Sequence, residues 1–274
     1  MEAAAERIVR DALAEDVGHG DLTTEGVIAP QAHCEAVIVV EQAGIVCGLE
    51  IARRVFTSLD PHASVELLTP DGTQITEMPC EVARIQAQAR AVLTGERTAL
   101  NLLGRLSGIA TLTAAYVEAV AGSGARILDT RKTTPGLRAL ERYAVACGGG
   151  TNHRAGLYDA ILLKENHLRL AGGVTAALAA LGARPGVMVE VETETLAEVA
   201  EALAAGATRI LLDNMSPAQV REAVDLVGRR AELEASGGIT LDNVRAYAQT
   251  GVDFISVGAL THSAGVLDVS LEVA

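Results

Sequence analysis

The spacing of hydrophobic residues changes along the chain, and each change predicts a different kind of structure. Apolar residues within Glu2–Leu13 recur at intervals of three and four, which predicts an amphipathic helix. From Cys34 to Arg90, short β-rich runs are separated by glycines and by a Pro70-Asp71-Gly72 turn, with a helical segment at Glu50–Ser58. This pattern predicts a small α/β sandwich. Its expected strands are Cys34–Val40, Val65–Thr69 and Val82–Gln88.

Beyond Gly124, apolar strand-like runs alternate with helical patterns, and the last four runs recur about every 22 residues. Such βα repetition requires parallel strands joined by right-handed crossovers. Six strands rather than eight favour an incomplete α/β barrel, with an open doubly wound sheet as the alternative. The expected strands are Arg126–Leu128, Ala160–Leu163, Val187–Val191, Arg209–Leu212, Ala231–Ala235 and Phe254–Val257, and the clearest helices are Leu196–Ala204, Pro217–Val227 and Leu241–Thr250.

Two further segments set the expected domain boundaries. Ala91–Val120 has a helical pattern interrupted near Gly104 and Gly108, which predicts two helices and a domain junction. Val266–Val273 alternates like a strand that rejoins the first domain. We therefore expect an α/β protein with an N-terminal α/β sandwich domain over residues 1–105, rejoined by residues 264–274. An incomplete parallel α/β barrel of about six strands is expected over residues 106–263.

Composition excludes several classes of protein. The 274 residues carry 22 Lys plus Arg against 35 Asp plus Glu, and a formal net charge of −13 argues against a nucleic-acid-binding surface. No apolar run approaches the ~20 residues that a membrane helix needs, and Met1–Arg10 lacks the features of an export signal. The four cysteines form no CxxC pair, so we expect core thiols and a cytoplasmic location.

Positive charge is concentrated in one part of this acidic chain. Between Arg126 and Arg169 there are eight basic and four acidic residues. Of the 22 basic residues only Lys132 and Lys164 are lysine, and each follows a predicted strand. Because ligands bind at the carboxyl ends of parallel strands, this cluster predicts an anion site that includes Arg131 and Arg154.

Carboxylates and glycines follow the later strands. Glu192 and Asp213 are candidates to bind a divalent ion, to contact sugar hydroxyls or to stabilise a developing cation; the alternative is ion pairing with Lys132 or Lys164. Glu190, one step deeper on the same strand face, is expected to be a structural partner of the cluster.

Glycine-rich segments follow the last two strands. Ser236-Gly237-Gly238 and Gly258 suit a phosphate site, because glycine lets backbone N–H groups approach an anion. His153 follows the Gly148–Gly150 stretch, which either folds over a site or caps the preceding helix. Asn166 and His167 are candidates to orient Lys164.

Taken together, these segments resemble the quinolinate phosphoribosyltransferases, the carboxylating nicotinate-nucleotide pyrophosphorylases, over essentially the whole chain. The segments that carry the resemblance are Asp129–Gly136, Asn152–Arg154, Leu163–His167, Glu190–Glu192, Leu211–Asn214 and Glu234–Thr240, together with Glu15-Asp16, Gly20-Asp21 and Glu96–Asn101. The resemblance implies transfer of phosphoribosyl from phosphoribosyl pyrophosphate to quinolinate. Nicotinate mononucleotide, pyrophosphate and CO2 are the expected products, with Mg²⁺ as cofactor, in NAD biosynthesis. It also implies a homodimer or higher homo-oligomer with shared active sites.

The resemblance further implies roles for individual residues. Arg131, His153, Arg154 and Lys164 would surround the quinolinate carboxylates with Lys132 beside them, and Arg97 would come from the neighbouring subunit. Lys132 and Lys164 are expected to be catalytic together with Glu192 and Asp213, which would also serve the ribose and metal side. The 5′-phosphate would lie against Ser236, Gly237, Gly238 and Gly258.

Three alternatives stay open at this point. A non-carboxylating nicotinate phosphoribosyltransferase handles one carboxylate and needs fewer cations than Arg131, Arg154 and Lys164 provide. A non-catalytic homologue similar to the molybdenum-transport relative would use the pocket for recognition only, although Glu192 and Asp213 weigh against it. A phosphate-binding barrel isomerase or synthase would leave the segments around Lys132 and Lys164 unexplained.

Overall fold

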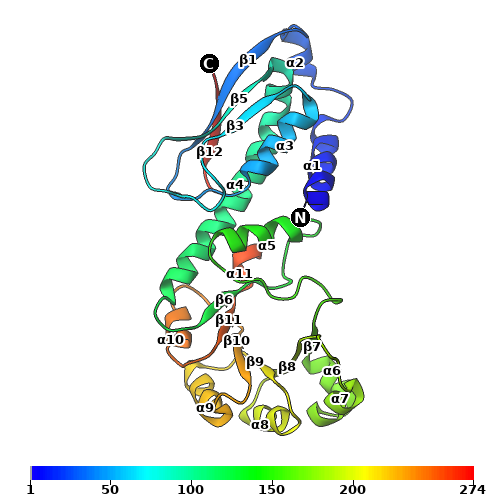
Figure 1. Ribbon diagram of the computed structural model, residues 1–274, viewed down its shortest axis with the longest axis vertical. Coiled ribbons are helices and arrows are strands. Elements are labelled where there is room, and N and C mark those ends of the chain that lie inside the picture. Colours follow the sequence, from blue (N-terminus) through cyan, green and yellow to red (C-terminus); the bar gives the residue numbers. More distant parts are fainter. Residues whose placement is uncertain (1) are drawn as a thin grey trace. The chain divides into compact units, whose positions relative to one another are not determined.

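The computed structural model describes residues 2–274, which form two compact units (Figure 1). The first, here called the sandwich unit, contains the chain up to Ala114 together with Thr133–Gly149 and Thr261–Ala274. The second, the barrel unit, contains Ala115–Lys132 and Gly150–Leu260. The chain therefore passes from the sandwich unit into the barrel unit and back more than once.

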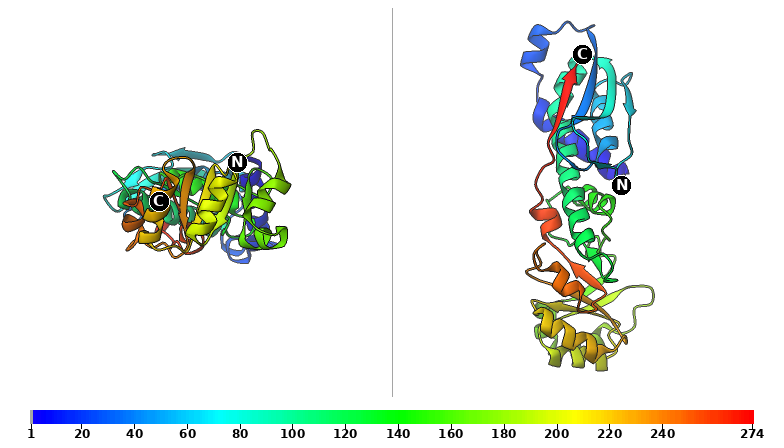
Figure 2. Two further views of the ribbon diagram at one scale, coloured as in Figure 1. Left: turned by 90° about the horizontal axis from the view of Figure 1, so that it is seen from below. Right: turned by 90° about the vertical axis from the view of Figure 1, so that its left-hand side faces the viewer.

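The sandwich unit is built on a four-stranded antiparallel sheet with the order β12-β1-β5-β3. The strands are β1 (His33–Val40), β3 (Ser64–Leu67), β5 (Cys80–Gln88) and β12 (Val269–Val273). Figure 2 shows β12, the last strand of the chain, alongside β1, and the pairing runs from Ala36 opposite Val273 to Val40 opposite Val269. A separate antiparallel pair consists of β2 (Gly44–Ile45) and β4 (Gln74–Ile75).

Helices bury apolar faces in this unit as the sequence pattern predicts. The predicted N-terminal helix is α1 (Glu2–Val17), and its buried residues Ala5, Ile8, Val9 and Leu13 lie on one stripe. The other helices are α2 (Leu22–Val27), α3 (Leu49–Leu59) and α5 (Arg138–Cys147). Phe56 of α3 is fully buried and is among the largest side chains of the core.

The predicted break near Gly104 and Gly108 is wrong, because α4 (Ala89–Ala119) is one continuous helix of 31 residues. Both glycines are sites of close packing instead. A Cβ atom at Gly108 would lie 1.9 Å from the carbonyl oxygen of Gly265, and one at Gly104 would lie 2.8 Å from that of Leu267. The absence of side chains lets the segment before β12 lie directly against the helix.

The barrel unit contains six parallel strands in the order β6-β11-β10-β9-β8-β7. They are β6 (Arg126–Leu128), β7 (Ile161–Leu163), β8 (Val189–Thr193), β9 (Arg209–Asp213), β10 (Glu232–Ser236) and β11 (Phe254–Ser256). Strand order follows chain order around the sheet, with β6 and β7 at its edges. This is the order of a barrel with missing strands, and it differs from a doubly wound sheet, in which the order reverses at a switch point.

Helices follow the strands of the barrel unit as the βα repetition predicts. They are α6 (Glu165–Ala171), α7 (Val174–Leu181), α8 (Leu196–Ala204), α9 (Pro217–Val227) and α10 (Val244–Ala248), and α11 (Ala259–His262) leads back to the sandwich unit. Figures 1 and 2 show α8 beside α9 along one face of the sheet. The sequence fixes the start of both helices, because Thr195 and Ser216 form capping boxes with Glu198 and Gln219.

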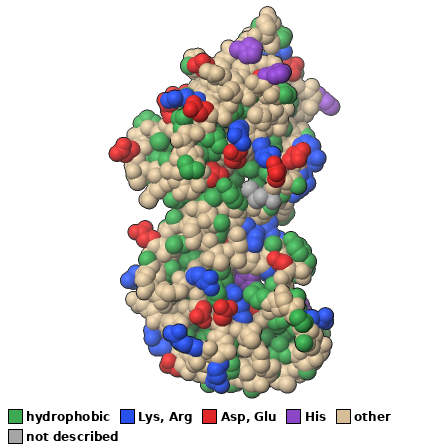
Figure 3. All heavy atoms as spheres, viewed as in Figure 1, with side chains coloured by type: hydrophobic (Ala, Val, Ile, Leu, Met, Phe, Trp, Pro, Cys, Tyr) green, Lys and Arg blue, Asp and Glu red, His purple; other side chains and the backbone are tan. Residues whose placement is uncertain are grey.

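The structure tests two of the expectations drawn from composition, those on membrane helices and on the cysteines. Within residues 2–274 there is no helix long and apolar enough to cross a membrane. Figure 3 shows acidic and basic side chains interspersed over the face in view. All four cysteines are free, but only Cys47 is fully buried, so the expectation of four core thiols is only partly met.

Candidate active site

Side-chain alternation along the strands of the barrel unit decides which residues point toward its interior. Residues two apart on a strand share a face. On β9, Arg209, Leu211 and Asp213 follow one another toward the carboxyl end of the strand. Glu192 on β8 and Glu234 on β10 both pair with Leu211, and Ser236 on β10 pairs with Asp213. The interior face therefore carries charged side chains from Arg209 at its deep end to Asp213 at the rim.

A pocket of about 550 Å³ opens at this rim. Its volume lies in the range of sites for small molecules. It is lined by Thr130, Arg131, Lys132, His153, Arg154, Leu162, Lys164, Glu192, Leu211, Asp213, Asn214, Glu234, Ser236, Gly237, Gly238 and Ser256. The segments that follow β6, β7, β8, β9 and β10 thus meet in one place, as parallel strands require.

Ten of the twelve predicted site residues line this pocket: Arg131, Lys132, His153, Arg154, Lys164, Glu192, Asp213, Ser236, Gly237 and Gly238. Two do not. Arg97 is exposed on α4 of the sandwich unit. Gly258 follows β11 but is not among the lining residues.

Two arginines give the pocket a strongly positive wall. Arg154 is 9% exposed, and its Nη1 donates a hydrogen bond to the carbonyl oxygen of Ala160 at 3.2 Å. Burial and the nearby positive charge of Arg131 both lower the pKa of Arg154. Like charges held together in a partly dry site repel each other, and a bound anion relieves that repulsion. This wall is therefore suited to an anionic ligand.

Lys164 and Glu192 form an ion pair across the strand ends of β7 and β8. The backbone N–H of Glu165 also donates to Glu192 Oε1 at 3.4 Å. His167 accepts a hydrogen bond at Nδ1 from the backbone N–H of Lys164 at 3.0 Å, so it fixes the backbone from which the Lys164 side chain extends. Asn166 accepts from Arg169 instead.

Asp213 is the second carboxylate at the rim. Burial and the charge of Glu192 raise its pKa, while Lys164 and Lys132 oppose that shift. The side-chain amide of Asn214 donates to Asp213 Oδ2 at 2.7 Å and holds it in place. Two carboxylates that repel each other beside two lysines form a site that accepts additional positive charge.

The glycine-rich turn after β10 is shaped by a close approach to Asn214. A Cβ atom at Gly237 would lie 2.2 Å from Asn214 Oδ1, and the backbone of Gly237 has φ +92°. Both features require glycine here. The backbone of this turn therefore reaches the pocket wall without side chains in between.

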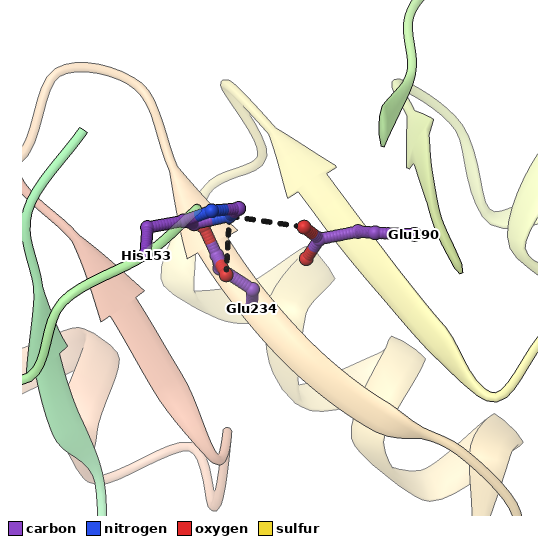
Figure 4. Close-up of side chains that lie close together, drawn as sticks. All are labelled: His153, Glu190 and Glu234. Carbon is purple, nitrogen blue, oxygen red and sulfur yellow. Dashed lines mark hydrogen bonds and ion pairs between the residues drawn. The ribbon is translucent and has the colours of Figure 1, made fainter. Parts of the chain in front are cut away.

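Beneath the pocket, His153 meets two buried glutamates (Figure 4). Its Nε2 lies 3.0 Å from Glu190 Oε2 and 3.5 Å from Glu234 Oε2, and both glutamate side chains are fully buried. Arg209 donates from Nε to Glu190 Oε1 at 3.0 Å and from Nη2 to Glu234 Oε2 at 2.6 Å. Its guanidinium also stacks on Phe254, 4.1 Å from the ring centroid.

The surroundings of His153 place a proton on Nε2. Burial lowers its pKa, and hydrogen bonds to Glu190 and Glu234 raise it. At the other ring nitrogen, the backbone N–H of Arg154 donates to Nδ1 at 2.6 Å, which only a neutral ring can accept. A ring that accepts at Nδ1 carries its one proton on Nε2.

His153, Glu190 and Glu234 also have the spacing of a metal-binding trio. Here Arg209 supplies the positive charge that two buried carboxylates need, and it occupies one oxygen of each. The four side chains form one hydrogen-bonded cluster, in which Glu190 is the structural partner that the sequence predicts.

Sequence reasoning missed Glu234, Arg209 and Ser256. A signal was present, since charged residues recur at alternate positions within otherwise apolar strands, as in Glu232-Leu233-Glu234. Which residues pair across strands depends on the order β8-β9-β10, and strand order has to be known before that signal identifies the cluster.

Comparison with known proteins covers both units. The family model of the quinolinate phosphoribosyl transferase N-terminal domain matches residues 21–107, and that of the C-terminal domain matches residues 109–272. A probable carboxylating nicotinate-nucleotide pyrophosphorylase of Bacillus subtilis (strain 168) is 45% identical over 261 residues, covering 94% of this chain and 90% of that protein.

Two further proteins are similar over nearly the whole of this chain. The carboxylating nicotinate-nucleotide pyrophosphorylase of Mycobacterium leprae (strain TN) is 42% identical over 277 residues, which are 98% of this chain and 97% of that one. The structure of the nicotinate-nucleotide pyrophosphorylase from Francisella tularensis superposes with a TM-score of 0.95 at 39% identity, covering 100% of this chain and 97% of that chain.

Proposed function

Because this chain belongs to the quinolinate phosphoribosyltransferase family, we propose that it transfers phosphoribosyl from phosphoribosyl pyrophosphate to quinolinate with decarboxylation. The products are nicotinate mononucleotide, pyrophosphate and CO2, and the reaction is a step of NAD biosynthesis. The observation that carries this assignment is the convergence of Arg131, Lys132, Arg154 and Lys164 with Glu192 and Asp213 in one pocket.

The charge pattern of the pocket fits both substrates. Quinolinate is a dianion, and bringing it to a second polyanion requires several fixed cations, which Arg131, Arg154 and Lys164 supply. Ser236 and the exposed backbone at Gly237 support a site for the 5′-phosphate. The nucleophile is the ring nitrogen of quinolinate, which attacks the anomeric carbon as pyrophosphate departs.

Glu192 and Asp213 have the chemistry needed at the ribose. The transition state of glycosyl transfer resembles an oxocarbenium ion, and fixed carboxylates close to it stabilise the developing positive charge. After transfer, the positive charge of the pyridinium ring stabilises the electron pair that remains at C2 when the bond to CO2 breaks, and a proton from solvent then completes nicotinate mononucleotide. A dry pocket around the C2 carboxylate favours this loss, and burial of Arg154 is in keeping with such an environment.

Mg²⁺ is the cofactor that we propose, held at Glu192 and Asp213. Mg²⁺ takes oxygen ligands and is usually bound by one or two carboxylates plus substrate phosphates. The donor set fits, because the pKa of Asp213 is raised by burial and by Glu192, and a cation relieves both effects. When bound with pyrophosphate, Mg²⁺ would neutralise charge on the leaving group.

We further propose a cytoplasmic homodimer or higher homo-oligomer in which Arg97 of each subunit completes the quinolinate pocket of a neighbour. Arg97 is exposed on α4, where it is accessible to another subunit. A third arginine, from a partner, would add positive charge to a site that we propose binds a dianion. Gly258 is proposed to assist at the 5′-phosphate through its backbone, close to the start of α11.

The alternatives are not favoured. Relatives that are 42% and 45% identical are named as carboxylating enzymes. A non-carboxylating nicotinate phosphoribosyltransferase does not explain three cations for one carboxylate. A binding homologue of the molybdenum-transport type does not need the paired carboxylates Glu192 and Asp213.

Product analysis tests the assignment directly. The purified protein is incubated with phosphoribosyl pyrophosphate and Mg²⁺, with either carboxyl-labelled quinolinate or nicotinate as acceptor. We expect nicotinate mononucleotide and one equivalent of labelled CO2 from quinolinate, and no product from nicotinate. Product from nicotinate alone would assign the non-carboxylating reaction, and tight quinolinate binding without product would assign a binding protein.

A further inference from the structure

The buried charges beneath the pocket are not used by the chemistry proposed above. Glu190 and Glu234 are fully buried, and Arg209 is 8% exposed. Glu234 Oε1 has no hydrogen-bond partner within residues 2–274. Removing ions from water is costly, and an unpaired buried polar atom adds to that cost. Well-packed apolar residues hold a sheet together at least as well as such a group, so stability of the sheet does not account for it.

The buried cluster of Glu190, Arg209 and Glu234 contacts His153, which lines the pocket. Arg209 lies on β9 between β8 and β10, and it holds Glu190 and Glu234 on the two neighbouring strands. Both carboxylates face the Nε2 of His153, whose side chain is only 7% exposed. Figure 4 shows the imidazole at the meeting point of the two glutamates.

His153 in turn fixes Arg154. The backbone N–H of His153 donates to Asp129 Oδ1 at 2.7 Å. Its ring accepts the backbone N–H of Arg154 at Nδ1, while the Arg154 guanidinium is bound to the carbonyl oxygen of Ala160. Arg154 is therefore held at both ends, and one of the two anchors is the imidazole.

The hydrogen bond from the Arg154 backbone N–H to Nδ1 requires that the proton of the His153 ring be on Nε2. If the proton were on Nδ1 instead, Nδ1 could not accept the backbone N–H of Arg154, and Nε2 would present a lone pair to two carboxylates. Glu190 from β8 and Glu234 from β10 face the ring, Arg209 from β9 binds both of these glutamates, and Asp129, which follows β6, accepts the backbone N–H of His153.

We propose that Glu190, Arg209 and Glu234 are positioning residues that keep the proton of His153 on Nε2 and fix its ring, and thereby set the place of the Arg154 guanidinium in the quinolinate pocket. This inference rests on the proposed function. Its specific consequence is that the cluster governs binding of quinolinate and has little effect on phosphoribosyl pyrophosphate.

The kinetic test compares two substitutions on the same strand. Glu234→Gln keeps the shape of the side chain and removes its charge next to His153. Glu232→Gln is the matched control, because Glu232 pairs with the same Arg209 at 3.7 Å but is 54% exposed and lies two residues earlier on β10. KM for each substrate, kcat and the melting temperature are measured for both variants.

We expect Glu234→Gln to raise KM for quinolinate by about 10- to 100-fold, since a misplacement of about 1 Å can cost up to about 100-fold. KM for phosphoribosyl pyrophosphate should change less than about threefold, and Glu232→Gln should resemble the wild type in every value. An unchanged KM for quinolinate in Glu234→Gln would overturn the proposal, and so would an equal rise in both KM values.

A second measurement needs only the wild-type fold. The ¹⁵N spectrum of histidine-labelled protein at pH 7.5 reports which ring nitrogen carries a proton, and the His153 signals are assigned by their loss in His153→Gln. We expect a proton on Nε2 and none on Nδ1, and a proton on Nδ1, in either a neutral or a charged ring, would overturn the proposal. An inactive wild type would refute the proposed function and leave this measurement valid.

Discussion

Replacement of Lys164 by alanine is the most direct test of the anion pocket. Lys164 is expected to face a substrate carboxylate while its ion pair with Glu192 fixes its position. A unit charge at about 4 Å contributes about 4 kcal/mol at an effective dielectric constant of about 20. Because the side chain is 47% exposed, solvent screening reduces this contribution to about 2–3 kcal/mol. The loss in kcat/KM for quinolinate is then about 30- to 150-fold.

The assay is the initial rate of nicotinate mononucleotide formation, with quinolinate varied at saturating phosphoribosyl pyrophosphate. Arg169→Ala is the matched control, since Arg169 lies on the adjoining α6, is 70% exposed and pairs with Glu165. It removes the same charge outside the pocket, so its kcat/KM should stay within about twofold of the wild type. A loss below about threefold in Lys164→Ala, or an equal loss in Arg169→Ala, would refute the reasoning.

Two other predictions follow from the same site. Mixing weakly active Arg97→Ala chains with weakly active Lys164→Ala chains should raise the activity above that of either variant if subunits share sites, and hybrid dimers without such a gain would contradict sharing. Asp213→Asn should weaken Mg²⁺ binding in the presence of pyrophosphate at least tenfold by calorimetry; equal affinity would place the metal elsewhere.

The elements with strong local signals were predicted well from the sequence. The helices Leu196–Ala204 and Pro217–Val227 match the structure at both ends, because capping boxes and a proline fix their starts. The expected helix at Leu241–Thr250 is shorter in the structure, over Val244–Ala248. Its ends carry turns that the apolar spacing alone does not distinguish from helix.

Two glycines in α4 show where a prediction from local helix propensity failed. At Gly104 and Gly108 a low helix propensity predicts a break, but the close approach of the segment before β12 determines the outcome. That segment lies more than 150 residues further along the chain. No local pattern can contain such a contact, so tertiary packing decided the structure at this point.

The pocket itself was predictable because one rule covers it: the ends of parallel strands meet at one edge. Reading the residues after each strand placed Arg131, Lys164 and Asp213 together without coordinates. The buried cluster around Arg209 could not be predicted in this way. Arg209 pairs with residues on two neighbouring strands, and the sequence does not state the order of the strands in the sheet.

The position of β12 has a consequence for synthesis of the chain. β12 pairs with β1 yet follows every strand of the barrel unit. At about 5–20 residues per second, a ribosome needs roughly 10 to 40 s to travel from the end of β5 to β12. During that time β1 presents an open edge, the kind of surface on which strands of other chains assemble. The sandwich unit, whose first strands are synthesised early, is therefore completed late. The nascent chain in which β1 is still unpaired on one side is the form exposed to aggregation.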